Sequence, residues 1–152
     1  MKESFKIIAG DSDMGMHELR LLIDGQEVEF SSGITFGVAA ELERLLDTSP
    51  NVRMVHLNSH GGRIGEARAM RELFRERDFN TFSATEYLSA CTVAFLGGQR
   101  RFLDSDARLG FHAADFPGSS DHDLRAANQE FVEEAVAYGV DRRFATRAYF
   151  TQ

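Results

Sequence analysis

The sequence has one cysteine, two prolines and no tryptophan. A lone cysteine cannot form a disulfide within the chain, and it excludes a zinc site made of several cysteines. The two lysines, Lys2 and Lys6, lie far upstream of the motifs described below, which disfavours a Ser–Lys catalytic pair. No apolar run approaches the about 20 residues of a membrane-spanning helix. The apolar run within residues 1–10 is too short for a signal peptide.

Positive charge is scarce as well. Lysine and arginine total 17 against 24 acidic residues, so the formal net charge is −7. Nucleic-acid phosphates and anionic lipids repel such a chain, and we expect neither nucleic acid nor a membrane as its main partner. The 152 residues, 43% of them apolar, suffice for one domain with a core. We expect a soluble cytoplasmic protein, or a periplasmic one if the sequence is a trimmed piece of an exported chain.

Strand and helix patterns alternate along the chain. Strands are predicted within residues 18–30, as a hairpin, and at 53–58, 81–84, 101–103 and 108–112; helices are predicted at 35–47, 64–77, 89–96, 124–138 and 141–149. Residues 1–16 are polar and are expected to form an irregular lead-in. Repeated strand–helix units predict an α/β fold.

Three features that can support chemistry follow one another in this pattern. The pair Gly61-Gly62 follows a predicted strand, Cys91 comes 29 residues after Gly62, and His112 comes 21 residues after Cys91. Backbone N–H groups at a glycine turn can bind an anion, a thiol can attack a carbonyl carbon, and a histidine can accept its proton. Together they are parts of an acyl-transfer site. Each also has a structural interpretation: a tight turn, a core cysteine and a half-buried histidine at a strand end.

Around these features, residues 33–139 resemble the ClpP/crotonase superfamily, and within it the ClpP-type serine peptidases. The family turn Asn-Ser-Pro-Gly-Gly is Asn-Ser-His-Gly-Gly at 58–62, and the nucleophile segment Ala-Ser-Met-Gly-Ala-Phe-Leu is Ala-Cys-Thr-Val-Ala-Phe-Leu at 90–96. The strand that ends in the basic histidine is Arg-Leu-Gly-Phe-His at 108–112. The resemblance implies a ClpP/crotonase-type α/β fold, a spiral of repeated β-β-α units, as a single domain over residues 17–152.

By this resemblance Cys91 stands at the nucleophile position and His112 at that of the general base, while the N–H groups of Gly62 and Thr92 form the oxyanion hole. Cysteine replaces the family's serine. The segment Ser-Ala-Cys-Thr at 89–92 is similar to the corresponding segment of a bacterial group of ClpP-like proteins that are often predicted to be periplasmic. The family's third residue, an aspartate, comes well after the long helix that follows the histidine; this sequence stops soon after that helix, so the usual position of the aspartate is missing. Either the sequence is truncated or another carboxylate orients His112, and Asp115 is the nearest along the chain.

The resemblance therefore implies a hydrolase, a peptidase that works by acyl transfer with a Cys–His pair. Two alternatives stay open: a ClpP-like peptide-binding or assembly module that has lost catalysis, and a crotonase-type enzyme that polarises an acyl-CoA thioester. We expect no cofactor, and no metal, because His17, His56 and His122 lack ligand spacing. The sequence identifies neither the substrate nor an ATPase partner.

A last expectation concerns assembly. ClpP-like proteins resemble one another in joining subunits through the long helix after the histidine. The helix predicted over residues 124–138 carries apolar residues three or four positions apart: Leu124, Ala127, Phe131, Ala135 and Tyr138. We therefore expect a homo-oligomer, a trimer, hexamer or larger ring.

Overall fold

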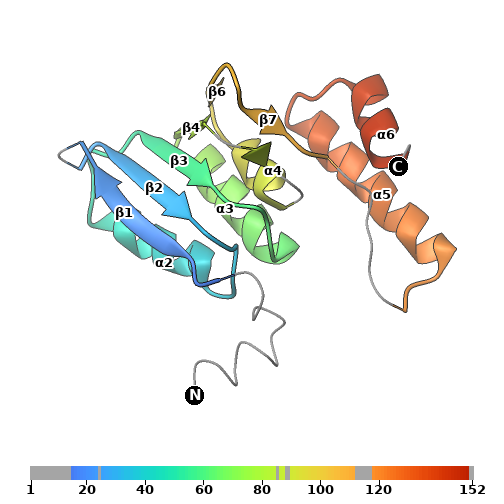
Figure 1. Cartoon of the computed structure of the whole chain (residues 1–152), viewed down its shortest axis with the longest axis horizontal. Coiled ribbons are helices and arrows are strands. Elements are labelled where there is room, and N and C mark those ends of the chain that lie inside the picture. Colours follow the sequence, from blue (N-terminus) through green and yellow to red (C-terminus); the bar gives the residue numbers. More distant parts are fainter. Residues whose placement is uncertain (1–14, 24, 85, 88–89, 112–117, 151–152) are drawn as a thin grey trace. The chain divides into compact units, whose positions relative to one another are not determined.

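The computed structural model describes residues 15–23, 25–84, 86–87, 90–111 and 118–150, and the chain separates into two compact units, residues 1–110 and 111–152 (Figure 1). The first unit contains β1 (Glu18–Leu22), β2 (Glu27–Ser31), α2 (Val38–Asp47), β3 (Met54–Asn58), α3 (Ile64–Glu76), β4 (Asn80–Ser83), β5 (Glu86–Tyr87), α4 (Ala90–Phe95), β6 (Arg101–Leu103) and β7 (Arg108–Leu109). The second contains α5 (Asp121–Ala137) and α6 (Arg142–Phe150). This alternation confirms the predicted α/β class.

A five-stranded sheet with the order β1-β2-β3-β4-β6 forms the centre of the first unit. The strands β1 and β2 form the predicted antiparallel hairpin, and β2, β3, β4 and β6 run parallel. Parallel neighbours need a crossover connection, and α2 and α3 provide the first two. Val28, Val55 and Thr81 lie side by side on successive strands and are fully buried, so this row marks the core face of the sheet.

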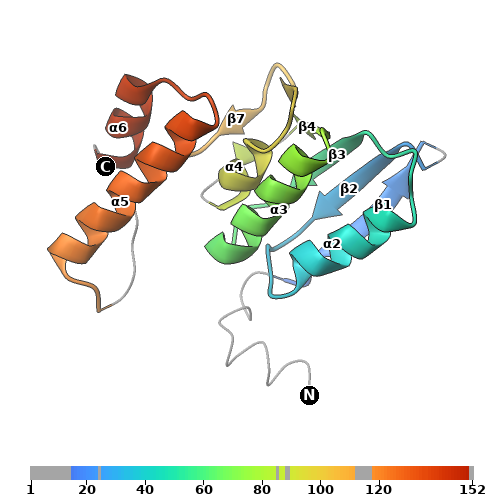
Figure 2. The same ribbon diagram turned by 180° about the vertical axis from the view of Figure 1, so that it is seen from behind.

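The helices α2 and α3 cover that core face; they lie behind the sheet in Figure 1 and in front of it in Figure 2. Their buried residues recur every three or four positions, as an amphipathic helix requires. On α2 these residues are Val38, Leu42 and Leu46, and on α3 they include Ala67, Met70 and Phe74. All of them join the buried strand residues in one apolar cluster.

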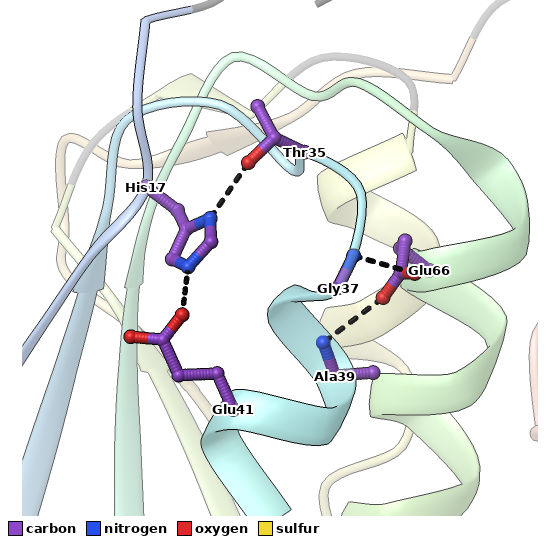
Figure 3. A network of polar contacts seen from close by, with 6 residues as sticks. All are labelled: His17, Thr35, Gly37, Ala39, Glu41 and Glu66. Carbon is purple, nitrogen blue, oxygen red and sulfur yellow. Dashed lines mark hydrogen bonds and ion pairs between the residues drawn. The ribbon is translucent and has the colours of Figure 1, made fainter. Parts of the chain in front are cut away.

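The N-terminus of α2 is capped by a carboxylate from α3 (Figure 3). Gly37 precedes the helix with φ 87°, in the region that favours glycine, and has no side chain to act as a cap. The two oxygens of Glu66 instead accept hydrogen bonds from the N–H groups of Gly37 and Ala39, at 3.0 and 2.9 Å. The helix therefore begins at Val38, three residues later than predicted, with two of its free N–H groups satisfied.

A histidine fastens the start of β1 to the same turn. Nδ1 of His17 lies 2.6 Å from Oγ1 of Thr35, and Nε2 lies 2.5 Å from a carboxylate oxygen of Glu41 (Figure 3). Thr35 follows Ile34, whose main chain pairs with the glycine turn after β3. These contacts hold in place the loop against which the candidate site is built.

The chain leaves α4 through a pair of glycines packed against backbone. A Cβ atom on Gly97 would lie 2.4 Å from the carbonyl oxygen of Arg71 in α3, and one on Gly98 would lie 2.2 Å from Oγ1 and 2.9 Å from N of Thr81. Oγ1 of Thr81 also donates a hydrogen bond to the carbonyl of Phe95, at 2.8 Å. The C-terminal end of α4 is thus fixed between α3 and β4.

In the second unit, α5 and α6 pack against each other. A capping box at Ser120 and Asp123 starts α5 at Asp121, three residues before the predicted start. Val132 and Ala135 are buried, and the ring of Phe131 lies 5.4 Å from that of Tyr149 in α6. Part of the apolar stripe expected to join subunits is therefore used inside this unit.

Candidate active site

The turn that follows β3 contains two consecutive glycines with positive φ. Gly61 and Gly62 have φ 114° and 147°, which only glycine adopts readily. The N–H of Ile34 donates to the carbonyl of Gly61, at 2.9 Å, and the carbonyl of Ile34 accepts from the N–H of Arg63, at 2.8 Å. In this parallel bridge the N–H of the middle residue, Gly62, points away from Ile34. Gly62 is exposed to solvent.

Cys91 is the second residue of α4, and every residue of this helix is buried. The prediction of a buried helix that begins just before Cys91 is confirmed. Burial raises the pKa of the Cys91 thiol far above its ordinary value, although hydrogen bonds with the backbone and the hydroxyl of Ser59 act in the opposite direction. The thiol is therefore protonated at neutral pH in this conformation, and attack on a carbonyl needs a base.

A hydrogen bond connects α4 to the strand that leads to His112. Oγ1 of Thr92 donates to the carbonyl of Gly110, at 2.8 Å, two residues before His112. The strands β5 and β7 also pair in parallel, with Glu86 beside Arg108. Because β5 runs into the segment before α4 and β7 runs toward His112, the chain leaves both strands at the same end of the pair.

His112 and Asp115 lie outside the described residues. The strand predicted to end at residue 112 ends earlier, at Leu109. Of the predicted site residues, the structure brings Thr92 to the end of β7, through its hydrogen bond to Gly110. Ser59 stabilises the glycine turn itself, since its Oγ accepts a hydrogen bond from the N–H of Gly61 at 3.1 Å.

Sequence reasoning missed Ser59 as a neighbour of Cys91, and it missed β5. Ser59 stands inside the motif at 58–62, but only the fold shows that its side chain turns inward, where 3% of its surface is exposed. The strand β5 has two residues, too few to show any alternation. A small hydroxyl residue at the end of a buried strand was the one available signal.

Two other histidines, His17 and His56, have structural contacts. His17 binds Thr35 and Glu41 as described, and Nε2 of His56 lies 2.9 Å from a carboxylate oxygen of Glu27 on the neighbouring strand. Within the part of the chain that the structure describes, no three His, Cys, Asp or Glu side chains gather as a metal site would require. Among these same residues no helix is both long and apolar enough to cross a membrane.

Because the thiol is buried, we predict that the free energy of unfolding decreases at alkaline pH. The folded protein holds the Cys91 proton more tightly than the unfolded chain, whose thiol has a pKa near 9.0. The contribution of this group to the free energy of unfolding is therefore fully present below pH 9.0. Above that pH the contribution declines by about 1.4 kcal/mol per pH unit. Urea unfolding between pH 7 and pH 10 should show this slope in the wild type and lose it in Cys91→Ala. Parallel curves for the two proteins would contradict the burial of the thiol.

Comparison with solved structures identifies the architecture. ClpP1 from Listeria monocytogenes superposes with a TM-score of 0.67 at 14% identity, covering 82% of this chain and 79% of that one. The ClpP protease catalytic domain from Plasmodium falciparum gives 0.58 at 18% identity, covering 82% and 70%. The chain has the ClpP/crotonase-type fold. A membrane-bound stomatin-specific protease gives 0.59 at 13% identity, covering 82% and 68%. Identities this low establish the fold alone, and the predicted fold is confirmed.

Comparison of amino-acid sequences adds little to this assignment of the fold. No protein-family model matches the chain. A 4-hydroxy-2-oxovalerate aldolase from Cupriavidus metallidurans is 31% identical over 100 residues, which are 66% of this chain and 28% of the aldolase. Because the chain spans little more than a quarter of that enzyme, the aldolase activity is not transferred to it.

Proposed function

We propose that the chain is a ClpP-like hydrolase, a peptidase of the Cys-bearing bacterial branch, that cleaves an amide or ester bond by acyl transfer. The observation that carries the proposal is the hydrogen bond from Thr92 to Gly110. It joins the residue after Cys91 to the strand that leads to His112. The ClpP/crotonase-type fold supports the same assignment.

In the proposed reaction Cys91 attacks the carbonyl carbon of the substrate and His112 accepts the thiol proton. The N–H groups of Gly62 and Thr92 bind the resulting oxyanion; one such donor contributes roughly 3–4 kcal/mol to the transition state. His112 then protonates the leaving amine or alcohol, and water hydrolyses the thioester and restores the thiol. Asp115 is proposed to orient His112. We propose that residues 17–152 act as one functional domain, because the reaction needs both Cys91 and His112.

A second function is favoured by the burial of Cys91. Cys91 has no exposed surface, and its raised pKa opposes the thiolate. Both features suit a ClpP-like module that binds peptides or assembles without catalysis. In the proposed hydrolase, substrate binding must uncover the sulfur and His112 must remove its proton.

An acyl-trapping experiment tests the proposal. The protein is mixed with activated peptide esters, quenched in acid and examined by mass spectrometry. We expect an acyl group on Cys91 that hydroxylamine removes, as it removes thioesters. Cys91→Ser should form an ester, if it reacts at all, and Cys91→Ala should stay unmodified. Peptide binding without any adduct or turnover would favour the module that has lost catalysis.

We also propose that the chain forms a homo-oligomer. Phe144 and Phe150 on α6 are 44% and 43% exposed. They give the second unit an exposed apolar surface that a second subunit would cover. Light scattering at micromolar concentration should give a multiple of the monomer mass, and Phe150→Glu should lower it without unfolding the protein. A monomeric mass for the wild type would refute this proposal.

A further inference from the structure

The helices α2 and α3 pack side by side over the sheet of the first unit, and a groove of about 440 Å³ lies between them (Figure 2). Small and acidic residues from both helices line this groove; among them are Ala40, Glu43, Ala69, Glu72 and Glu76. Among the described residues that line it there is no lysine or arginine. The groove therefore presents negative charge, and its short alanine side chains allow another helix to approach closely.

Two of these glutamates have a spacing that a second helix can match. Glu72 and Glu76 are four residues apart on α3 and both are exposed, so their side chains lie one turn apart on the same face. Arg71 lies 3.6 Å from Glu72, so one of the two carboxylates already has a cation nearby. The groove thus offers a pair of carboxylates at the interval of one helical turn.

The exposed face of α6 carries the complementary charges. Arg143 and Arg147 are exposed and four positions apart, the same spacing as that of Glu72 and Glu76. Phe150 follows Arg147 by three positions, lies on the same face and is 43% exposed. The buried residues of α6 lie on its opposite face. A basic and aromatic face of the helix is therefore presented to solvent.

We propose that α6 of one copy of the chain docks into the groove between α2 and α3 of a second copy. In this contact Arg143 and Arg147 face Glu72 and Glu76, and the ring of Phe150 covers alanine side chains of the groove. A guanidinium group can bind a carboxylate through two parallel hydrogen bonds, and two such pairs at equal spacing align the helices. The inference deepens the proposed homo-oligomer and rests on it, but it does not depend on the proposed reaction.

Charge reversal on each surface tests the contact. We expect Arg143→Glu with Arg147→Glu, and separately Glu72→Arg with Glu76→Arg, to raise the dissociation constant about 100-fold or more, because like charges then face each other. Light scattering at micromolar concentration should give the monomer mass for each variant, and circular dichroism should show that both are folded. An equimolar mixture of the two variants should associate again, because each α6 then meets a groove of opposite charge.

Arg44→Glu with Arg125→Glu is the matched control. Both arginines are exposed, and neither lines the groove or belongs to α6. This control changes the net charge of the chain as much as the α6 variant does, and it should keep the wild-type mass. If charge reversal unfolds a variant, Arg143→Gln with Arg147→Gln is measured in its place and should raise the dissociation constant about tenfold.

The possible results separate this contact from the proposals on which it rests. An oligomer that persists in either charge-reversed variant, or a mixture that stays monomeric, would overturn the contact and leave the homo-oligomer standing. Dissociation of the control would also overturn it, since net charge alone would then explain the loss of association. A monomeric wild type would refute the homo-oligomer and this contact together. Hydrolysis of a substrate, or its absence, affects neither conclusion.

Discussion

Replacing Cys91 with alanine is expected to abolish turnover and to leave the protein folded. Removing the nucleophile of an acyl-transfer site lowers kcat by about four orders of magnitude or more, because the oxyanion donors alone give little catalysis. The structural effect should be small, since one sulfur atom is lost from a buried position and the melting temperature changes by a few degrees at most. Hydrolysis of the ester substrates identified by acyl trapping, together with a thermal melt, measures both quantities.

Val93→Ala is the matched control for this change. Val93 lies on the same helix and is 6% exposed, and it has no role in the proposed reaction. We expect Val93→Ala to lose about 1–3 kcal/mol of stability and to keep its kcat. If Cys91→Ala lost as much stability as this control and no activity, the cysteine would be a packing residue.

Gly98→Ala is expected to destabilise the protein by about 3 kcal/mol or more. The added methyl group would lie 2.2 Å from Oγ1 and 2.9 Å from the backbone nitrogen of Thr81. The hydroxyl cannot turn away without losing its bond to Phe95, and the nitrogen belongs to the central sheet. Gly97→Ala should be similar, because its methyl group would lie 2.4 Å from the carbonyl oxygen of Arg71.

Gly65→Ala, in contrast to Gly98→Ala, is expected to stabilise the protein. Gly65 lies in the first turn of α3, and a methyl group there would meet no atom within 4 Å. Alanine is preferred over glycine in a helix by roughly 0.5–1 kcal/mol, so this variant should be slightly more stable than the wild type. Chemical unfolding of the three variants measures the differences. Equal effects at residues 65 and 98 would show that α4 does not pack as closely as described.

The α/β class was predictable because the strand and helix patterns are regular, and the ClpP/crotonase-type fold was predicted from the resemblance of three motifs. The hairpin at β1 and β2, the strand β3 and the helix α3 all show clear periodicity, and their predicted bounds differ from the structure by one or two residues. The predicted start of α2 was wrong by three residues. The helix begins after a left-handed turn at Gly37, and its cap is Glu66, which lies 29 positions further along the chain. Contacts of that kind leave no local signal.

The candidate site was predictable in its residue types and less so in its geometry. The positions of Gly62 and Cys91 came from resemblance, and their local settings, a glycine turn and a buried helix, agree with the prediction. The hydrogen bond from Thr92 to Gly110 was not foreseen, because it joins residues that are 18 positions apart in the chain. The pairing of Cys91 with His112 stays a prediction.

The short length of α4 has a consequence for the order of folding. A helix of six residues is unstable by itself, and α4 is held by Thr81, by the backbone of Arg71 and by Gly110. We therefore expect it to form after β4, α3 and the end of β7 have come together. Until then the only thiol of the chain is open to oxidants and to the thiols of other molecules. A chain that matures in an oxidising compartment would need to complete this step quickly, before cross-linked dimers accumulate.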